Sequence, residues 1–574
     1  MAYKFTDAGR YRYEPEGFFL GADDEGREVG IRSERHLITV AGAGSGKGAA
    51  LIVPNLKRWR GSCVVVDPKG ENATITAAER AGMGQHVGVV DPYETVTGNA
   101  AGLRCSINPL DLLDPESLTF RADLEVLADG LVRTFDPKHE EWAETARRMI
   151  AGVADAVIAT QPRENWTLPT IRAVFVLPPD GLERVAKRMA SLETETGLAQ
   201  EAGSLFLSKL ANGDSLDAQA FTKAGKELGW IGDKAFRPIL NGDLPRFDLR
   251  TLKAGTGSLY LCIDPDKLRT RGQFLRLFVS MGLQVMMSGL AKKDDPRCLF
   301  LLDEFHSLGR LDQVAVAAGL MRGYGVQLWP FLQDLGQLEK LYGPNEMHTF
   351  FSNADAHIFF GNTDKPTLDY VSQRLGIVTP DEIGPPPAMG GGGNVIPLMA
   401  PQRRRGRVDA VGIGMALMQS LNHAGASSAQ ARYQHKQMMV GKPRVAPDQA
   451  RELTAKHDGD KVARSMIVFA KGKHVLNVRL APYFAPMPRP LSAAHVSAPP
   501  KELAGIIAAR LSLGLLLVAP FMLFIILAAR NAPGGGLPAP LLLLTVALYA
   551  AVGAWLFKAR IGRRLCAAAG VPFF

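Results

Sequence analysis

Two short segments of this 574-residue chain carry the residue types needed to bind and hydrolyse a nucleoside triphosphate. In the first, residues 38–56, the sequence ITVAGAGSGKGAALIVPNL joins an apolar strand to a glycine-rich turn and then to a helix-compatible run. Successive backbone N–H groups of such a turn surround phosphate oxygens, and a lysine adds a point charge. We therefore predict an ATP site formed by Gly42, Gly44, Ser45, Gly46, Lys47 and Gly48.

This loop departs from the general pattern G-x-x-x-x-G-K-[ST] at two positions, Ala41 and Gly48. The glycine at position 48 matters because the Ser or Thr that usually stands there binds Mg²⁺ through its hydroxyl. Two other motifs do not fit: a dinucleotide fingerprint would need Gly in place of Lys47, and G-x-S-x-G would need Gly in place of Ala43. The remaining alternative is a glycine-rich turn without a ligand.

The second segment, residues 298–312, reads CLFLLDEFHSLGRLD and places two acids after an apolar strand. We expect Asp303 to hold the Mg²⁺ shell, mainly through water, and Glu304 to orient and deprotonate the attacking water. Two acids at a strand end are ordinary when they occur alone. Their presence in one chain with the phosphate loop favours ATP hydrolysis.

Two further residues could complete a nucleotide motor. Gln333 ends the apolar run 326–333, where an amide could contact the γ-phosphate and report its loss. Arg322 lies just before that run and could reach the nucleotide of a neighbouring subunit as an arginine finger. The alternatives are a helix cap for Gln333 and a surface ion pair for Arg322.

These residues require a sheet to position them. Short apolar runs alternate with helical patterns and predict an α/β fold with a mostly parallel sheet, whose sites lie at the carboxyl ends of its strands. We expect an N-terminal segment (1–36), a nucleotide-binding domain (37–107 and 251–484) and an inserted all-α domain (108–250). A Pro/Gly-rich excursion (385–407) contains Arg403, Arg404, Arg405 and Arg407, which are candidates for DNA contact or are simply solvated.

Composition adds weaker constraints. The formal charge of +9 is compatible with a polyanionic partner or anionic lipid. Five scattered cysteines without a C-x-x-C pair indicate reduced thiols.

The C-terminal sequence predicts a transmembrane helical hairpin after a linker (485–510). Residues 511–529 and 539–557 carry no charge and are long enough to span a bilayer, although a buried hairpin of a globular fold is the alternative. The tail 558–574 and the approach to the first span are rich in Lys and Arg. We therefore expect a multi-pass membrane protein with the ATPase body and both termini in the cytoplasm.

The order of several motifs resembles the TraG-type coupling proteins of type IV secretion and conjugation. These motifs are AGAGSGKGAALIVPNL, VVVDPKGEN, INPLDLLDP, LFLLDEFHSLGRL, MRGYGVQLWPFLQDLGQLEKLYG and ADAHIFFGNTDKPTLDYVSQRLG. The resemblance covers roughly residues 30–380, and Gly commonly follows the loop lysine in that family. It implies a RecA-like, generally hexameric ATPase of the bacterial inner membrane with ATP and Mg²⁺ as cofactors. It also implies the roles given above for Lys47, Asp303, Glu304, Gln333 and Arg322, and leaves Ser45 or water to supply the metal ligand.

By this resemblance, the chain delivers relaxase-bound DNA or protein effectors to the inner-membrane components of a type IV secretion channel. One feature departs from the family: its membrane helices usually precede the ATPase, whereas the predicted hairpin follows it here. The alternatives are a nucleotide-binding receptor or scaffold with little hydrolysis, and a double-stranded DNA translocase of the FtsK kind.

Overall fold

A computed structural model describes residues 3–132, 140–292, 295–379, 440–472 and 474–487. The chain divides into two units, residues 1–23 with 27–488, and residues 24–26 with 489–574. The fold given below is that of the first unit. The excursion 385–407, the predicted spans 511–529 and 539–557 and the tail 558–574 lie outside the described residues.

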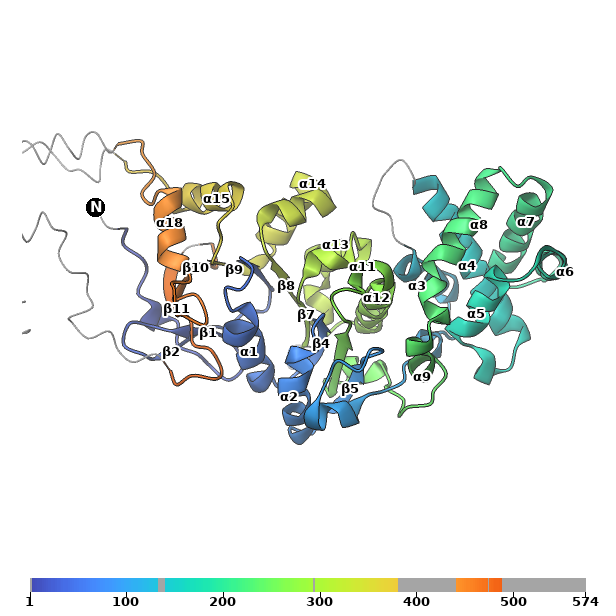
Figure 1. The fold of residues 1–574 in the computed structure, drawn as a ribbon, viewed down its shortest axis with the longest axis horizontal. Coiled ribbons are helices and arrows are strands. Elements are labelled where there is room, and N and C mark those ends of the chain that lie inside the picture. Colours follow the sequence, from blue (N-terminus) through green and yellow to red (C-terminus); the bar gives the residue numbers. More distant parts are fainter. Residues whose placement is uncertain (1–2, 133–139, 293–294, 380–439, 473, 488–574) are drawn as a thin grey trace, which may run out of the picture. The chain divides into compact units, whose positions relative to one another are not determined.

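One 11-stranded mixed sheet organises this unit, in the order β2-β1-β11-β10-β9-β3-β8-β7-β4-β6-β5 (Figure 1). The strands from β9 to β5 run parallel, and β10, β11, β1 and β2 extend the sheet in antiparallel fashion. In spatial order the parallel strands are β9 (Ala354–Phe360), β3 (His36–Ala41), β8 (Val326–Leu332), β7 (Cys298–Leu302), β4 (Ser62–Asp67), β6 (Gly257–Cys262) and β5 (His86–Val90). The predicted mixture of helices and mostly parallel strands is confirmed.

The antiparallel strands come from both ends of the described chain. It consists of β1 (Phe18–Ala22), β2 (Glu28–Ile31), β10 (Ser465–Ala470) and β11 (His474–Arg479). The N-terminal pair was not expected from the sequence, because the first 36 residues are polar overall. Pairing of Ala22 with Arg479 joins the two pairs of strands.

Apolar side chains cover both faces of the sheet, as near-continuous apolar strands require. Along β4, Val64 and Val66 belong to one core cluster and Cys63 and Val65 to the other. The second cluster includes residues of α1 (Val53–Arg58) and α2 (Glu71–Gly82). The first includes α12 (Gln273–Met287), α13 (Asp312–Leu320) and α14 (Leu335–Ser352). α15 (Lys365–Leu375) and α18 (Pro447–Thr454) flank β9 and β10 along the chain.

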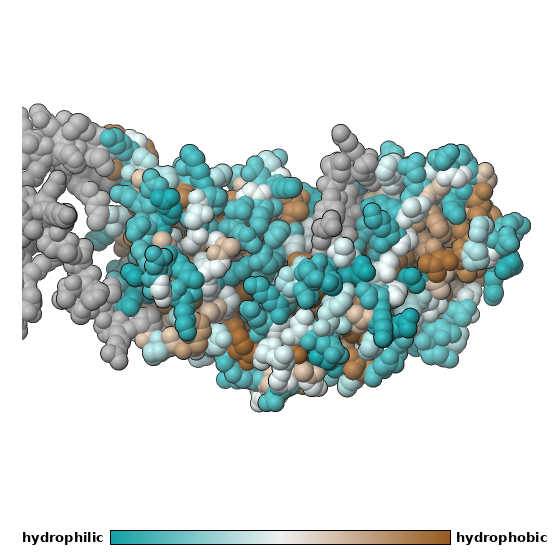
Figure 2. All heavy atoms as spheres, viewed as in Figure 1, coloured by the Kyte–Doolittle hydropathy of each residue, from teal (hydrophilic) through white to brown (hydrophobic). Residues whose placement is uncertain are grey.

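Between β5 and β6, the described chain contains helices and isolated β-bridges but no strand. Its helices are α3 (Phe120–Leu131), α4 (Glu140–Thr160), α5 (Leu168–Phe175), α6 (Pro179–Ala190), α7 (Leu198–Ala211), α8 (Leu216–Glu227), α9 (Arg237–Leu240) and α10 (Arg250–Lys253). Gln284 of α12 donates to Asp123 of α3 at 2.5 Å, so these helices are tied to the sheet's own helices. The face drawn in Figure 2 is mostly hydrophilic, with brown areas over the region of α4 to α8. The domain boundaries themselves remain a prediction.

The prediction of a multi-pass membrane protein is corrected here. Within the described ranges, no helix has the length and apolar character needed to cross a bilayer. The longest of these helices, α4, has 21 residues but carries Glu140, Arg147 and Asp155. These charged residues suit a helix that packs with other helices and faces water in part. Both predicted spans lie outside the described residues.

Candidate active site at the carboxyl end of the parallel strands

The glycine-rich loop leaves the carboxyl end of β3, between β9 and β8. Gly44 and Gly46 have φ angles of 68° and 97°, which disfavour any residue with a side chain. A methyl group at Gly42 would lie 1.9 Å from the Gly361 carbonyl oxygen, and one at Gly46 would lie 2.4 Å from Val462 Cγ1. The backbone therefore makes close approaches that only glycine allows. Gly48–Ile52 then forms a π-helical turn that continues into α1.

Lys47 lies between the two predicted acids. Its Nζ is 3.0 Å from Asp303 Oδ1 and 2.6 Å from Glu304 Oε1. The three side chains are 16%, 16% and 22% exposed, so water can still reach them. β3 and β7 are separated only by β8, which explains how residues 256 positions apart meet: parallel strands end at the same edge of the sheet.

Glu304 receives two further contacts. Gln333 Nε2 donates to Glu304 Oε2 at 3.0 Å, and His306 Nδ1 lies 3.6 Å from the same oxygen. Glu304 itself has φ 49° and ψ 45°, a left-handed conformation that is uncommon outside glycine and is found at functional sites. The backbone turn therefore directs this carboxylate toward Lys47 and Gln333.

Electrostatics differentiates the two acids. Burial raises the pKa of Asp303 above its usual value, against the lowering effect of Lys47. Burial also acts to raise the pKa of Glu304, but Lys47 and Gln333 together hold it below its usual value. For Lys47, burial acts to lower the pKa, and Asp303 and Glu304 outweigh that effect and raise it. Two acids whose pKa values are pushed apart are typical of a site with separate acid and base roles.

The loop has the properties of a phosphate site. Ser45 Oγ is buried and has no hydrogen-bond partner among the described residues. Gly44 has open space where a side chain would stand. A buried, unpaired hydroxyl is costly unless a ligand or water satisfies it. With the cation of Lys47 and the helix that begins at Gly48, these features fit the phosphates of a nucleotide, and the carboxylate of Asp303 suits Mg²⁺.

The structure adds residues that the sequence did not suggest. The segment between α18 and β10 packs on the loop: Ala463 N donates to Ser45 O at 2.8 Å, and Lys456 Nζ donates to Gly44 O at 3.4 Å. Nothing in their local sequence indicates this position. Asp67, buried at the end of β4, has a strand-end position like that of Asp303, and this pattern could have identified it.

Of the other predicted site residues, Arg322 lies in the turn Met321–Tyr324 immediately before β8, and the placement of its side chain is not described. Arg403, Arg404, Arg405 and Arg407 lie outside the described residues. The geometry thus brings together Lys47, Asp303, Glu304 and Gln333.

Residues 2–382 match the sequence model of a family described as "Type IV secretory system Conjugative DNA transfer". Protein VirD4 of Rhizobium radiobacter is 28% identical over 351 residues, covering 60% of this chain and 48% of that protein. Conjugal transfer protein TraG of Agrobacterium fabrum (strain C58 / ATCC 33970) is 26% identical over 352 residues, covering 60% of this chain and 51% of that protein. The chain therefore matches about half the length of these relatives.

A solved structure described as "Plasmid coupling protein TrwB in complex with ADP and Mg2+" shares the fold. The TM-score is 0.54 with 16% sequence identity, over 84% of this chain and 93% of that one. At this identity the likeness concerns the fold.

Proposed function

Because the chain belongs to the family of type IV secretory system conjugative DNA transfer proteins, we propose that it is a RecA-like coupling ATPase. It uses ATP and Mg²⁺ to deliver DNA with bound relaxase, or protein effectors, to a type IV secretion channel. The observation that carries the proposal is the contact of Lys47 with both Asp303 and Glu304 at the carboxyl edge of the sheet. Binding alone would not require a glutamate at the position of Glu304.

The proposed roles follow from these contacts. The amides of the glycine-rich loop and Lys47 hold the phosphates, and Asp303 holds the Mg²⁺ shell through water. Glu304 takes a proton from the water whose oxygen attacks the γ-phosphorus while the bond from that phosphorus to the ADP oxygen breaks. Gln333 is bonded to Glu304 and follows the state of the site.

Lys47 links the binding of ATP to the activation of Glu304 as a base. With its ammonium group 2.6 Å from Glu304, Lys47 neutralises the carboxylate that must act as a base. A phosphate group competes for the same cation and leaves Glu304 free to accept a proton. ATP binding therefore activates the base in this proposal.

Ring formation and DNA contact extend the proposal beyond a single chain. Arg322 serves a neighbouring subunit's nucleotide, and a hexamer gathers six copies of the segment with Arg403, Arg404, Arg405 and Arg407. Several weak phosphate contacts then act together, and DNA binding falls steeply with salt.

The test is steady-state ATPase activity of the purified full-length chain, with and without single- and double-stranded DNA. We expect DNA to stimulate turnover, and Lys47→Ala and Glu304→Gln each to reduce it by at least about 100-fold, because Lys47 holds the reacting phosphate and Glu304 takes the proton of the attacking water. The exposed pair Lys187 and Glu183 of α6 offers matched controls, Lys187→Ala and Glu183→Gln, which should keep the wild-type rate. Tight ATP binding with negligible turnover would favour the receptor instead.

A further inference from the structure

The phosphate loop lacks a residue that a nucleotide site with Mg²⁺ normally provides. The first residue after Lys47 is Gly48, so no hydroxyl extends from the start of the helix toward the metal. The inference below rests on the proposed function, because it concerns the metal of the same ATP site.

One side chain occupies the space next to Gly48. A methyl group added at Gly48 would lie 3.9 Å from Asn72 Oδ1, and no other heavy atom of the described residues comes within 4 Å of it from outside its own helix and chain neighbours. Asn72 is the second residue of α2 and only 5% exposed. Its amide therefore stands beside the position where a serine hydroxyl would begin.

The hydrogen bond from the Asn72 amide to Asp67 sets the direction of the Asn72 oxygen. Asn72 Nδ2 donates to Asp67 Oδ1 at 3.2 Å, and Ala73 N donates to Asp67 Oδ2 at 2.8 Å. The amide NH₂ group thus faces Asp67, and the oxygen faces Gly48. Among the described residues, no donor is bonded to this oxygen, although the side chain is almost wholly buried. The oxygen itself is not enclosed, and an accessible amide oxygen without a donor is suited to a cation.

The sheet order places Asn72 on the side of the loop where the metal is expected. β4, which ends at Asp67, pairs with β7 in register, with Val66 opposite Leu302, so Asp67 and Asp303 end neighbouring strands. Burial, together with the nearby charge of Asp303, raises the pKa of Asp67 to about 7.

Ser45, the other candidate, lies on the opposite side. A methyl group at Gly361 would be 3.3 Å from Ser45 Oγ, and Gly361 follows β9, which borders β3 on the side away from β7. The side chain of Ser45 therefore lies at the β9 end of the loop. The Asn72 oxygen is the one that shares a side with Asp303.

We propose that Asn72 Oδ1 provides the side-chain ligand toward Mg²⁺ that Gly48 cannot provide. An amide oxygen is a hard donor of the kind Mg²⁺ accepts, and one such ligand suffices because Mg²⁺ keeps several waters and nucleotide oxygens.

The experiment measures ADP binding to the full-length chain by titration calorimetry, once with excess Mg²⁺ and once with EDTA. The ratio of the two dissociation constants reports the metal's contribution without any turnover. We expect Asn72→Ala to leave the EDTA value within about twofold of wild type and to reduce the Mg²⁺ enhancement by about 10-fold or more, as loss of a metal-supporting residue does. Glu71→Ala, an exposed neighbour in the same helix turn, is the matched control and should retain the enhancement.

A second variant separates a metal role from a structural one. Gly48→Ser has room for its side chain, and in the Asn72→Ala background it should restore the Mg²⁺ enhancement by supplying the hydroxyl. Asn72→Asp, which keeps an oxygen at the position, should also retain it and serves if Asn72→Ala does not fold.

The outcomes are distinct. An unchanged Mg²⁺ enhancement in Asn72→Ala overturns the assignment, as does a loss that Gly48→Ser fails to restore. A wild-type chain that binds no ADP under either condition overturns the proposed function, and this inference with it.

Discussion

At the scale of single residues, the site depends on one cation shared by two acids. Lys47, Asp303 and Glu304 hold one another in place at a mostly buried edge of the sheet that water still reaches. Removing Lys47 leaves two carboxylates without a cation, which is costly in partly buried surroundings, and removing either acid breaks one of the two ion pairs. Variants at these positions therefore report on stability as well as on activity, and each needs a folding control.

Asp67 gives a pH prediction at this scale. The pKa of Asp67 is about 7 in the folded chain, against an ordinary value of 3.8. Between these two pH values, the folded chain keeps a proton on Asp67 that the unfolded chain has lost. The contribution of protonated Asp67 to the free energy of unfolding is fully present below about pH 4 and is lost as the pH rises through 7. From pH 5 to pH 8, we expect the thermal midpoint of wild type to fall more than that of Asp67→Asn.

The size of this effect is a few kcal/mol at most, at about 1.4 kcal/mol per pKa unit. Thermal unfolding followed by circular dichroism at pH 5, 6, 7 and 8 measures it. Asp214→Asn, which changes an exposed acid between α7 and α8, should leave the wild-type slope unchanged. Parallel slopes for wild type and Asp67→Asn would refute the prediction.

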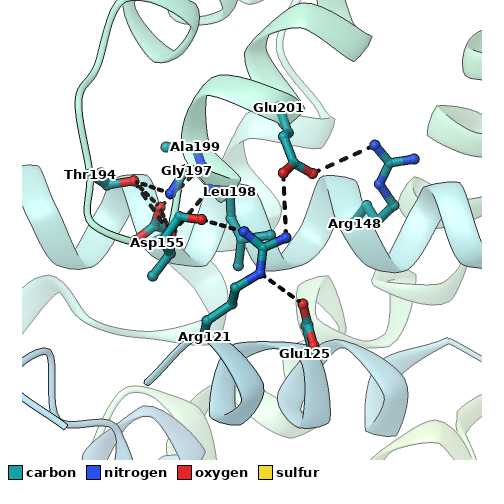
Figure 3. Close-up of polar contacts among 10 residues, drawn as sticks. Arg121, Glu125, Arg148, Asp155, Thr194, Gly197, Leu198, Ala199 and Glu201 are labelled. Carbon is teal, nitrogen blue, oxygen red and sulfur yellow. Dashed lines mark hydrogen bonds and ion pairs between the residues drawn. The ribbon is translucent and has the colours of Figure 1, made fainter. Parts of the chain in front are cut away.

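At the scale of elements, helix α7 begins on a buried acid of helix α4. Asp155 accepts hydrogen bonds from Thr194 Oγ1 and Thr196 Oγ1, both at 2.6 Å, and from Ala199 N at 3.0 Å (Figure 3). The carboxylate thereby satisfies an amide at the start of α7 and fixes the turn that precedes it. Around it, exposed ion pairs connect Arg121, Arg148, Glu125 and Glu201.

We expect Asp155→Ala to destabilise the chain by about 3 kcal/mol, because three donors lose a charged acceptor and the amide of buried Ala199 is left without its partner. Glu201→Ala removes only exposed ion pairs and should cost less than about 1 kcal/mol. Denaturant unfolding gives both values, and hydrogen exchange at Gly197, Leu198 and Ala199 localises the effect. Equal losses in the two variants would contradict this account. Neither change touches the phosphate loop, so ADP affinity should remain that of wild type.

At the scale of the whole molecule, the proposed finger makes activity a property of neighbouring subunits. Lys47→Ala disables a subunit's own site, whereas Arg322→Ala disables the site of its neighbour. In rings mixed at random from equal parts of the two variants, about a quarter of the interfaces pair an intact site with an intact finger. We therefore expect about a quarter of the wild-type ATPase rate to return on mixing.

The control for this prediction is a mixture of Lys47→Ala with Glu304→Gln. Both changes damage a subunit's own site, so no interface is repaired and activity should stay absent. Activity that fails to return in the first mixture, although both variants assemble, would show that Arg322 does not act between subunits.

The sequence by itself determined the local elements and the residues with chemical potential. Apolar runs specified strands such as β3, β4, β7 and β8, because burial on both faces leaves no room for polar alternation. The glycines before Lys47 and the acids after β7 were visible as motifs, since each depends on backbone or charge within a few residues. The polar N-terminal segment concealed β1 and β2, which are strands chiefly because β11 pairs with β1.

Only the tertiary structure decided which distant residues share the site. The order of the strands brings Lys47 to Asp303 and Glu304, places Gln333 on the same carboxylate and sets Ser45 and Asn72 on opposite sides of the loop. Lys456 and Ala463 contact the loop from a segment more than 400 residues away. Such contacts depend on crossover connections between parallel strands, and local sequence pattern carries no information about which strand ends become neighbours.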